Sequence, residues 1–339
     1  MSFLKVVKIK GLPLVILFLF LLGCDKMLVE SNSDPSANMR DFIEVWAFVD
    51  ANYPFFEYMD ISSEYLYAKY HPLAKQAKGD EIFKVIIDML AELKDGHTMF
   101  RNKTSGVYDM MPYLMPRILQ DYHKFNPAVT RKYFEKDLTV LEDKTLEYGI
   151  TGNNIGYIYI SSFTDFQTNP REFDNALSFL KNTKALILDV RHNTGGDFYK
   201  VAGRFVSSER EVVFYNKLNK IEKEYIRPRG AFIYTQPIVI LINGCSVSGA
   251  EFIAANLQPL PNVTLVGDTT AGLGGSDTET NLSSGKWVST TRLKSFYYGN
   301  LIQWNGIPPD ILVENTEQEI KIDIDSQLAY AIRYLNNLQ

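Results

Sequence analysis

Three short segments rich in aliphatic residues most constrain how this 339-residue chain can fold. Residues 185–190 and 237–242 are almost continuously apolar, and residues 264–267 form a shorter segment of the same kind. Strands that are buried on both faces of a sheet have this composition. A strand-like alternation at 155–160 and helical spacing at 170–180 and 250–257 are interleaved with these segments. The order predicts an α/β core whose parallel strands are joined by helical crossovers.

The N-terminus has the features of a targeting segment. Lys5, Lys8 and Lys10 give a basic start, and residues 12–22 form an apolar run that is short for a permanent membrane span. The run ends in Leu-Leu-Gly directly before Cys24, which resembles a bacterial lipobox. We therefore expect residues 1–23 to be a lipoprotein signal peptide and Cys24 to carry a lipid that anchors the chain to a membrane. A plain secretory signal with an incidental Cys24 is the alternative.

Charge and residue usage exclude several classes of function. The net charge is −5, from 35 basic and 40 acidic residues without a basic stripe, so nucleic acid is not an expected partner. With Cys24 lipidated, Cys245 has no cysteine left with which to form a disulfide. No zinc motif such as HExxH occurs, so we predict neither a metal nor another cofactor. The four histidines are scattered along the chain, at His71, His97, His123 and His192.

The first half of the chain is predicted to be helical. The apolar spacing between residues 39 and 93 fits two helix faces, and Asp80 is a predicted N-cap for the second. We divide the chain into five parts by their composition and pattern. These are a signal peptide (1–23), a tether (24–38), an N-terminal helical subdomain (39–100), a connecting region (101–152) and a catalytic core (153–339).

The segment between Asn243 and Glu251 holds a serine at a position suited to nucleophilic attack. Ser248 lies between the apolar strand 237–242 and the helix 250–257. Unpaired backbone N–H groups at a helix start, that of Gly249 first among them, can stabilise an oxyanion. The same pattern also fits a simple N-cap at Ser246 or Ser248, and the local sequence does not decide between these roles.

Two further segments carry candidate chemistry. Residues 189–196 read Asp-Val-Arg-His-Asn-Thr-Gly-Gly, and the pair Gly195 and Gly196 lets the backbone approach a ligand closely. An ordinary strand-to-helix turn would look the same. His97 lies in Leu-Lys-Asp-Gly-His-Thr at 93–98. A lone histidine is more often structural, yet histidine is also the usual base for an activated serine.

Four ordered motifs between residues 156 and 313 resemble the C-terminal-processing, or tail-specific, serine peptidases. Residues 189–196 resemble that family's oxyanion loop, and residues 243–251 resemble its nucleophile segment in a register that selects Ser248 over Ser246. Residues 266–272 resemble the following strand and glycine turn, and Gly-Ile-Pro-Pro-Asp-Ile at 306–311 resembles the closing signature. The resemblance implies a crotonase/ClpP-like core of ββα units.

Departures from the family pattern select one branch of it. Many members use a Ser–Lys dyad, but the matching lysine position here is Leu273, which cannot take a proton. A second branch, similar to the tricorn core and the retinoid-binding-protein repeats, places a histidine in a segment like that of His97. In that branch a glutamate often stands where this chain has Gln303. The roughly 60 residues between His97 and Gly156 leave no room for the usual peptide-binding PDZ module.

The resemblance implies a serine endopeptidase that acts on peptides or unfolded proteins, and the lipobox-like segment at Cys24 adds a lipid anchor in the bacterial cell envelope. Ser248 is its predicted nucleophile, and His97 is its predicted base, oriented by Gln303. Gly249 and one of Gly195 or Gly196 are its predicted oxyanion donors. The periplasm or outer membrane of a Gram-negative cell is the expected location. The alternative is a weak or inactive protein on the same fold that binds a peptide or an apolar ligand, which the residues at 273 and 303 favour.

Overall fold

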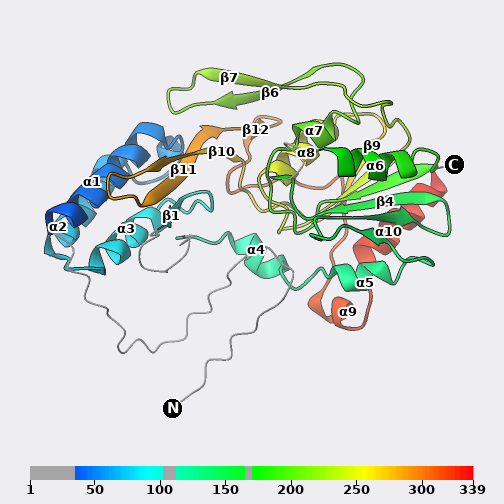
Figure 1. The fold of residues 1–339 in the computed structure, drawn as a ribbon, viewed down its shortest axis with the longest axis horizontal. Helices are drawn as coiled ribbons and strands as arrows, with labels where there is room; N and C mark the ends of the chain where they lie inside the picture. The colour runs from blue at the N-terminus through cyan, green and yellow to red at the C-terminus, as the bar shows by residue number, and fades with distance from the viewer. Residues whose placement is uncertain (1–34, 102–111, 165–169, 339) are drawn as a thin grey trace, which may run out of the picture.

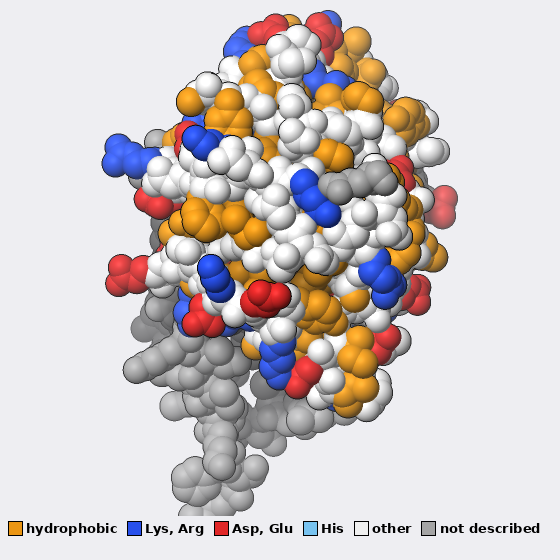
Figure 2. All heavy atoms as spheres, turned by 90° about the vertical axis from the view of Figure 1, so that its right-hand side faces the viewer, with side chains coloured by type: hydrophobic (Ala, Val, Ile, Leu, Met, Phe, Trp, Pro, Cys, Tyr) orange, Lys and Arg blue, Asp and Glu red, His pale blue; other side chains and the backbone are white. Residues whose placement is uncertain are grey.

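The computed structural model describes residues 35–101, 112–164 and 170–338 (Figure 1). The predicted signal peptide, Cys24 and most of the predicted tether lie outside these residues. Within the described ranges, no helix is both long and apolar enough to cross a membrane. On the face in Figure 2, acidic and basic side chains are interspersed with small hydrophobic patches.

A seven-stranded sheet forms the centre of the larger half of the molecule (Figure 1). Its order is β14-β9-β8-β5-β4-β3-β2, with parallel pairing from β4 to β14 and antiparallel pairing among β2, β3 and β4. The predicted parallel α/β core is therefore confirmed. The strands are β2 (Thr139–Val140), β3 (Leu146–Ile150), β4 (Ile155–Ile160), β5 (Ala185–Asp189), β8 (Ile238–Ile242), β9 (Val263–Gly267) and β14 (Ile311–Leu312).

Helices cover both faces of this sheet, which explains its apolar strands. In β5, Leu186 and Leu188 pack into the cluster under α6 and α8, whereas Ile187 packs into the cluster under α10. Strands covered on both sides have no face left for polar residues. The helices of this half are α4 (Pro116–Asp121), α5 (Pro127–Arg131), α6 (Arg171–Phe179), α7 (Tyr199–Ala202), α8 (Gly249–Leu257), α9 (Glu317–Lys321) and α10 (Ser326–Asn337).

The N-terminal half contains the predicted helices: α1 (Pro35–Asn52), α2 (Ser63–Gln76) and α3 (Glu81–Ala91), with a short 3-10 helix at Phe56–Tyr58. Asp80 does occupy the N-cap position of α3, but its side chain makes no capping hydrogen bond. Instead, the Glu81 carboxylate accepts a hydrogen bond from the backbone N–H of Lys78, at 2.9 Å.

A second sheet joins this helical half to the rest of the chain. Its order is β1-β11-β6-β7, and β10 also pairs with β11. Val288 of β11 and Leu282 of the β10–β11 turn belong to the same hydrophobic cluster as Phe42 and Ile86. The helical core is thus completed by residues about 200 to 250 positions later in the chain. The remaining strands are β1 (Met99–Arg101), β6 (Arg210–Tyr215), β7 (Ile221–Ile226), β10 (Gly275–Asn281), β11 (Trp287–Lys294), β12 (Phe296–Tyr297) and β13 (Asn300–Leu301).

The region between the two halves is more ordered than a simple connection. Residues 101–152 were predicted to connect the halves, but the described part of this region holds two helices and the strands β2 and β3. Since β3 pairs with β4 along its length, the central sheet begins before residue 153.

Candidate active site

Ser248 lies at the sharp turn between β8 and α8. Its backbone has φ 52° and ψ −112°, a left-handed conformation that costs a non-glycine residue about 1–3 kcal/mol. Ser248 is the N-cap residue of α8, but its side chain makes no capping hydrogen bond. Its N–H is donated to the Glu251 carboxylate at 3.0 Å, and the Glu251 N–H is donated to the Ser248 backbone carbonyl at 2.8 Å. The helix start is therefore held by the backbone and by Glu251, and the Ser248 hydroxyl is not used as a cap.

Ser246 has a different environment from Ser248. Its side chain is buried, its hydroxyl donates to the Val190 carbonyl at 2.8 Å, and it accepts the Asn243 N–H at 3.1 Å. These bonds tie the turn after β8 to the end of β5. Ser246 thus maintains the turn on which Ser248 is presented.

Gly195 and Gly196 pack directly against the Ser248 turn. A Cβ on Gly195 would lie 2.7 Å from the Ser248 Cβ, and a Cβ on Gly249 would lie 2.2 Å from the Gly196 carbonyl oxygen. Both loop glycines have positive φ, at 88° and 107°, so glycine is required for conformation as well as for space.

The backbone donors of these glycines are not equivalent. The Gly195 N–H is donated to the Asn193 side chain at 2.8 Å. Within the described residues, neither the Gly196 N–H nor the Gly249 N–H has a hydrogen-bond partner. Two unpaired donors beside a serine are what stabilisation of an oxyanion requires.

Glu251 joins Ser248 to the glycine turn that follows β9. Its fully buried carboxylate accepts the Ser248 N–H at 3.0 Å and the Leu273 N–H at 2.7 Å. It also accepts the Gly272 N–H at 2.8 Å and the Thr270 hydroxyl at 2.7 Å. Burial raises the pKa of Glu251, while the four donors lower it; the net direction is upward. In the sequence, Glu251 served only to align the nucleophile segment with the family motif, which selected Ser248 over Ser246.

Leu273 lies between the nucleophile turn and the loop of His97. Its N–H bonds to Glu251, and its side chain is so close to Gly96 that a Cβ there would lie 2.9 Å from Leu273 Cδ2. The position that carries lysine in the Ser–Lys branch is thus filled by an apolar side chain packed against the histidine loop.

The His97 loop is held by β11. The Ser289 hydroxyl donates to the His97 carbonyl at 2.8 Å, and the Thr291 hydroxyl donates to the Asp95 carboxylate at 2.6 Å. The chain runs from the Leu273 turn into β10 and then into β11. One stretch of chain therefore positions both the Ser248 segment and the His97 segment. The His97 side chain is largely buried, and its Nδ1 has no hydrogen-bond partner in the described structure.

Gln303 lies in the same cluster but does not bond to the histidine. A Cβ on Gly274 would lie 2.9 Å from the Gln303 backbone nitrogen, and the neighbouring Trp304 N–H donates to the Gly272 carbonyl at 2.8 Å. The Gln303 side chain is fully buried, and neither polar atom of its amide has a hydrogen-bond partner in the described structure.

A groove of about 760 Å³ opens beside this cluster. Its lining includes Lys94 and Trp304, which are joined by a 2.8 Å hydrogen bond from the indole to the Lys94 carbonyl. The groove is therefore next to the two segments that carry His97 and Gln303.

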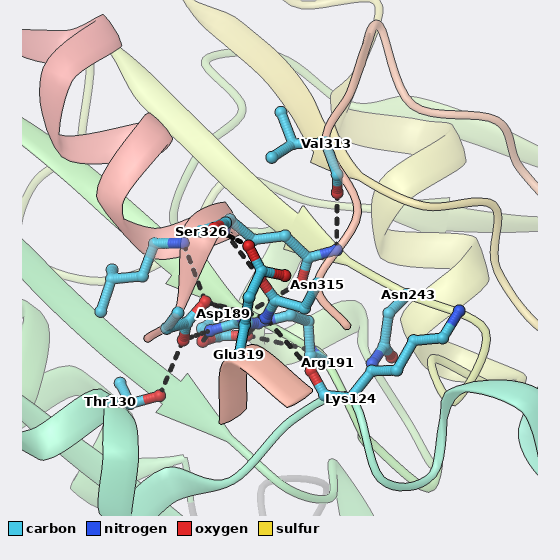
Figure 3. A network of polar contacts seen from close by, with 12 residues as sticks. Lys124, Thr130, Asp189, Arg191, Asn243, Val313, Asn315, Glu319 and Ser326 are labelled. Carbon is cyan, nitrogen blue, oxygen red and sulfur yellow. Dashed lines mark hydrogen bonds and ion pairs between the residues drawn. The ribbon is translucent and has the colours of Figure 1, made fainter. Parts of the chain in front are cut away.

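Arg191 of the glycine-loop motif has a structural role (Figure 3). Its guanidinium is fully buried between Asp189, at 2.6 Å, and Asp325, at 2.8 Å. Asp325 caps α10 and also accepts hydrogen bonds from Thr130 and Asn315. The motif thereby fixes the end of β5 to the C-terminal helix, a partner that the local sequence did not indicate.

The fold and the turn at Ser248 resemble those of serine peptidases with a mixed α/β core. Residues 154–313, slightly less than half of the chain, match the model of Peptidase family S41. The predicted resemblance is confirmed.

Individual relatives support the same assignment. The chain is 31% identical over 188 residues to a carboxy-terminal processing protease, CtpA, of Bacillus subtilis, which covers 52% of this chain and 40% of the relative. It is 29% identical over 184 residues to a carboxy-terminal-processing protease of Bartonella bacilliformis, covering 52% of this chain and 42% of the relative. The chain thus spans about two fifths of the length of these relatives.

Solved structures extend the likeness to the whole fold. A crystal structure from Parabacteroides merdae, described as that of a candidate peptidase, has a TM-score of 0.72 and 25% identity and covers 90% of this chain and 97% of that one. The tricorn protease shares the fold, with a TM-score of 0.58 at 16% identity over 89% of this chain and 37% of its own.

Proposed function

We propose that this protein is a lipid-anchored serine-type endopeptidase in which Ser248 is the nucleophile and His97 the general base. The observation that carries the proposal is the packing of Gly195 and Gly196 on the Ser248–Gly249 turn, with two backbone donors left unpaired. The groove lined by Lys94 and Trp304 gives an extended peptide room to lie next to the segments that carry His97 and Gln303.

The proposed reaction follows from these positions. The Ser248 oxygen attacks the peptide carbonyl carbon while its proton passes to His97. The Gly196 and Gly249 N–H groups stabilise the negative charge on the carbonyl oxygen. His97 then gives the proton to the leaving amine as the C–N bond breaks. Water, deprotonated by His97, releases the acyl group and restores the Ser248 hydroxyl.

Labelling with a fluorophosphonate probe tests the nucleophile. We expect the wild-type protein to form a covalent adduct and to cleave an unstructured protein, and the Ser248→Ala variant to do neither. Ser178→Ala is the matched control, because Ser178 is exposed on α6, away from the turn. A folded wild-type protein that is neither labelled nor able to cleave such substrates would contradict the proposal.

A ligand-binding protein on the same fold is the second candidate, and the neutral Leu273 and Gln303 favour it. It requires an affinity for a peptide that is unchanged in Ser248→Ala, without any turnover by the wild-type protein. Isothermal titration of both proteins with the same unstructured peptide separates this function from catalysis. A large loss of affinity in the variant counts against it.

The proposed lipid anchor rests on the apolar run at 12–22 and on Cys24. We expect the chain, expressed in a Gram-negative host, to incorporate a fatty-acid label and to sediment with envelope membranes. Cys24→Ser should abolish labelling and release the protein from the membranes, whereas Cys245→Ser should change neither. Equal labelling of the Cys24→Ser variant and the wild type would exclude lipidation at this site.

A further inference from the structure

We propose that Asp95 is the positioning residue that supplies His97 with the negative charge which Gln303 cannot provide. The inference rests on the proposed function, because it assigns a partner to the proposed base. It concerns a carboxylate that the sequence pattern treated only as part of the motif around the histidine.

The geometry of the Asp95 side chain carries the proposal. Asp95 is fully buried, and its Oδ1 lies 3.8 Å from the His97 Nδ1. The same oxygen accepts the His97 backbone N–H at 2.9 Å, and Oδ2 accepts the Thr291 hydroxyl at 2.6 Å. Both oxygens are thereby fixed, one by the loop itself and the other by β11. Because these hydrogen bonds fix the Asp95 carboxylate to the His97 loop, its negative charge stays in the same position relative to the His97 ring.

The His97 ring has no other hydrogen-bonding partner at this nitrogen in the described structure. Its buried Nδ1 is unpaired, and the Gln303 amide is also unpaired. An amide carries no net charge, so it stabilises an imidazolium less than a carboxylate does. A separation of 3.8 Å is long for a hydrogen bond but within ion-pair distance once the ring accepts a proton. Such contacts commonly tighten when substrate binds.

The other titratable groups around the loop do not take this role. Lys94, on the same loop, is a cation and repels a protonated ring. Tyr53, directly after α1, donates its hydroxyl to the Leu93 carbonyl at 3.0 Å, and burial raises its pKa well above the ordinary value, so it stays neutral. The carboxylate of Glu251 on α8 already accepts four hydrogen bonds, from the Ser248 turn and from the turn after β9. Asp95 is the carboxylate left facing the ring among the described residues.

Asp95→Asn tests the charge while keeping the shape and the acceptor for the His97 N–H. An opposite charge within about 4–6 Å changes a titration by about 1–3 pH units. We therefore expect the acidic limb of the pH–rate profile to move about one unit lower and kcat to fall at least about tenfold, with KM little changed. Gln303→Glu added to this variant should recover much of kcat, because a carboxylate returns to the cluster. Asp323→Asn is the control, since Asp323 is an exposed carboxylate paired with Lys132 at 2.5 Å and does not line the groove beside Trp304.

The outcomes separate the two proposals. A wild-type protein that the fluorophosphonate does not label overturns the proposed function and this inference with it. A labelled wild type with an Asp95→Asn variant of equal kcat and unchanged acidic limb overturns only the role of Asp95. If Asp95→Asn does not fold, Asp95→Ser replaces it, because a serine hydroxyl can also accept the N–H two residues on. Unchanged kcat and acidic limb in folded Asp95→Ser overturn the role of Asp95 equally.

Discussion

Glu251 is the side chain on which the segments of the candidate site converge. It holds the Ser248 turn directly and the turn after β9 through Thr270, Gly272 and Leu273. Thr270 in turn accepts the Ile307 N–H of the closing motif at 2.7 Å. Three of the four motifs recognised in the sequence thus meet at one buried carboxylate, and the fourth reaches it through the packing of Gly195 on Ser248.

Replacing this carboxylate by an amide should disrupt both turns. In Glu251→Gln the amide NH₂ faces two of the four donors, whichever way it is oriented. Hydrogen bonds to charged groups contribute about 1.5–3 kcal/mol, and a buried donor left unpaired adds to the loss. We expect the free energy of unfolding in urea to fall by about 3 kcal/mol and Ser248 labelling to slow markedly.

Glu319→Gln is the matched control for this prediction. Glu319 likewise accepts the N–H of an N-cap residue, Thr316 at the start of α9, but in an exposed position. The loss of such a cap typically costs about 1 kcal/mol and should leave Ser248 labelling unchanged. Equal losses of stability and labelling in the two variants would contradict the central role of Glu251.

Individual residues of the site differed in how far the sequence could place them. Ser248, Gly249 and the Gly195–Gly196 pair follow adjacent parallel strands, β8 and β5, so the strand order alone brings them together. The contacts of Asp95, Glu251 and Leu273 depend on turns that are distant in the chain. The positions of these residues in the sequence do not predict such contacts. The resemblance pointed to Gln303, yet its unpaired amide could be seen only in the structure.

Among the elements, β10 and β11 could not be predicted from the sequence. β10 reads Gly-Ser-Asp-Thr-Glu-Thr-Asn, with polar residues on both faces, so it lacks the alternation that marks a strand. Its partner β11 is stabilised by contacts with β1 and with the helices α1 to α3, which lie about 190 to 250 residues earlier. In contrast, β5, β8 and the crossover helices are fixed by local composition, and those predictions were confirmed.

At the scale of the whole molecule, the two halves are connected by chain that returns from the core to the helices. The Leu273 turn leaves the core, forms β10 and β11 against the helical half, and comes back through Gln303. Any movement of the helical half must therefore change the relation of His97 to Ser248. The proposed catalysis is for this reason sensitive to global stability as well as to the residues of the site.

His192 gives that global stability a predictable dependence on pH. It follows Arg191, stacks on Tyr122 with ring centroids 5.6 Å apart and meets Phe125 edge-on at 5.1 Å. Burial lowers the pKa of His192 to about 4 from its ordinary 6.5, and the charge of Arg191 acts in the same direction. The unfolded chain therefore binds a proton at this residue in a pH range where the folded protein does not.

The sign of the effect follows from this difference in proton binding. Above pH 6.5 the ring is neutral in both states, and between pH 6.5 and about 4 the unfolded state is favoured progressively as the pH falls. We expect up to about 2 kcal/mol of folding free energy to be lost through this group between pH 7 and pH 5. His192→Asn removes the titration, and asparagine tolerates the left-handed φ of 56° at this position.

Urea unfolding of the wild type and His192→Asn at pH 7 and pH 5 isolates the contribution of this ring. Any fixed cost of the substitution is present at both pH values and cancels in the comparison. The wild type should lose about 2 kcal/mol more than the variant on acidification, with m-values that agree between the two proteins. If both proteins lose the same free energy, protonation of His192 does not control the stability of the fold in this range. Acid sensitivity must then come from carboxylates such as Asp174, whose pKa is lowered because the contacts with Arg229 and Arg204 outweigh burial, which raises it.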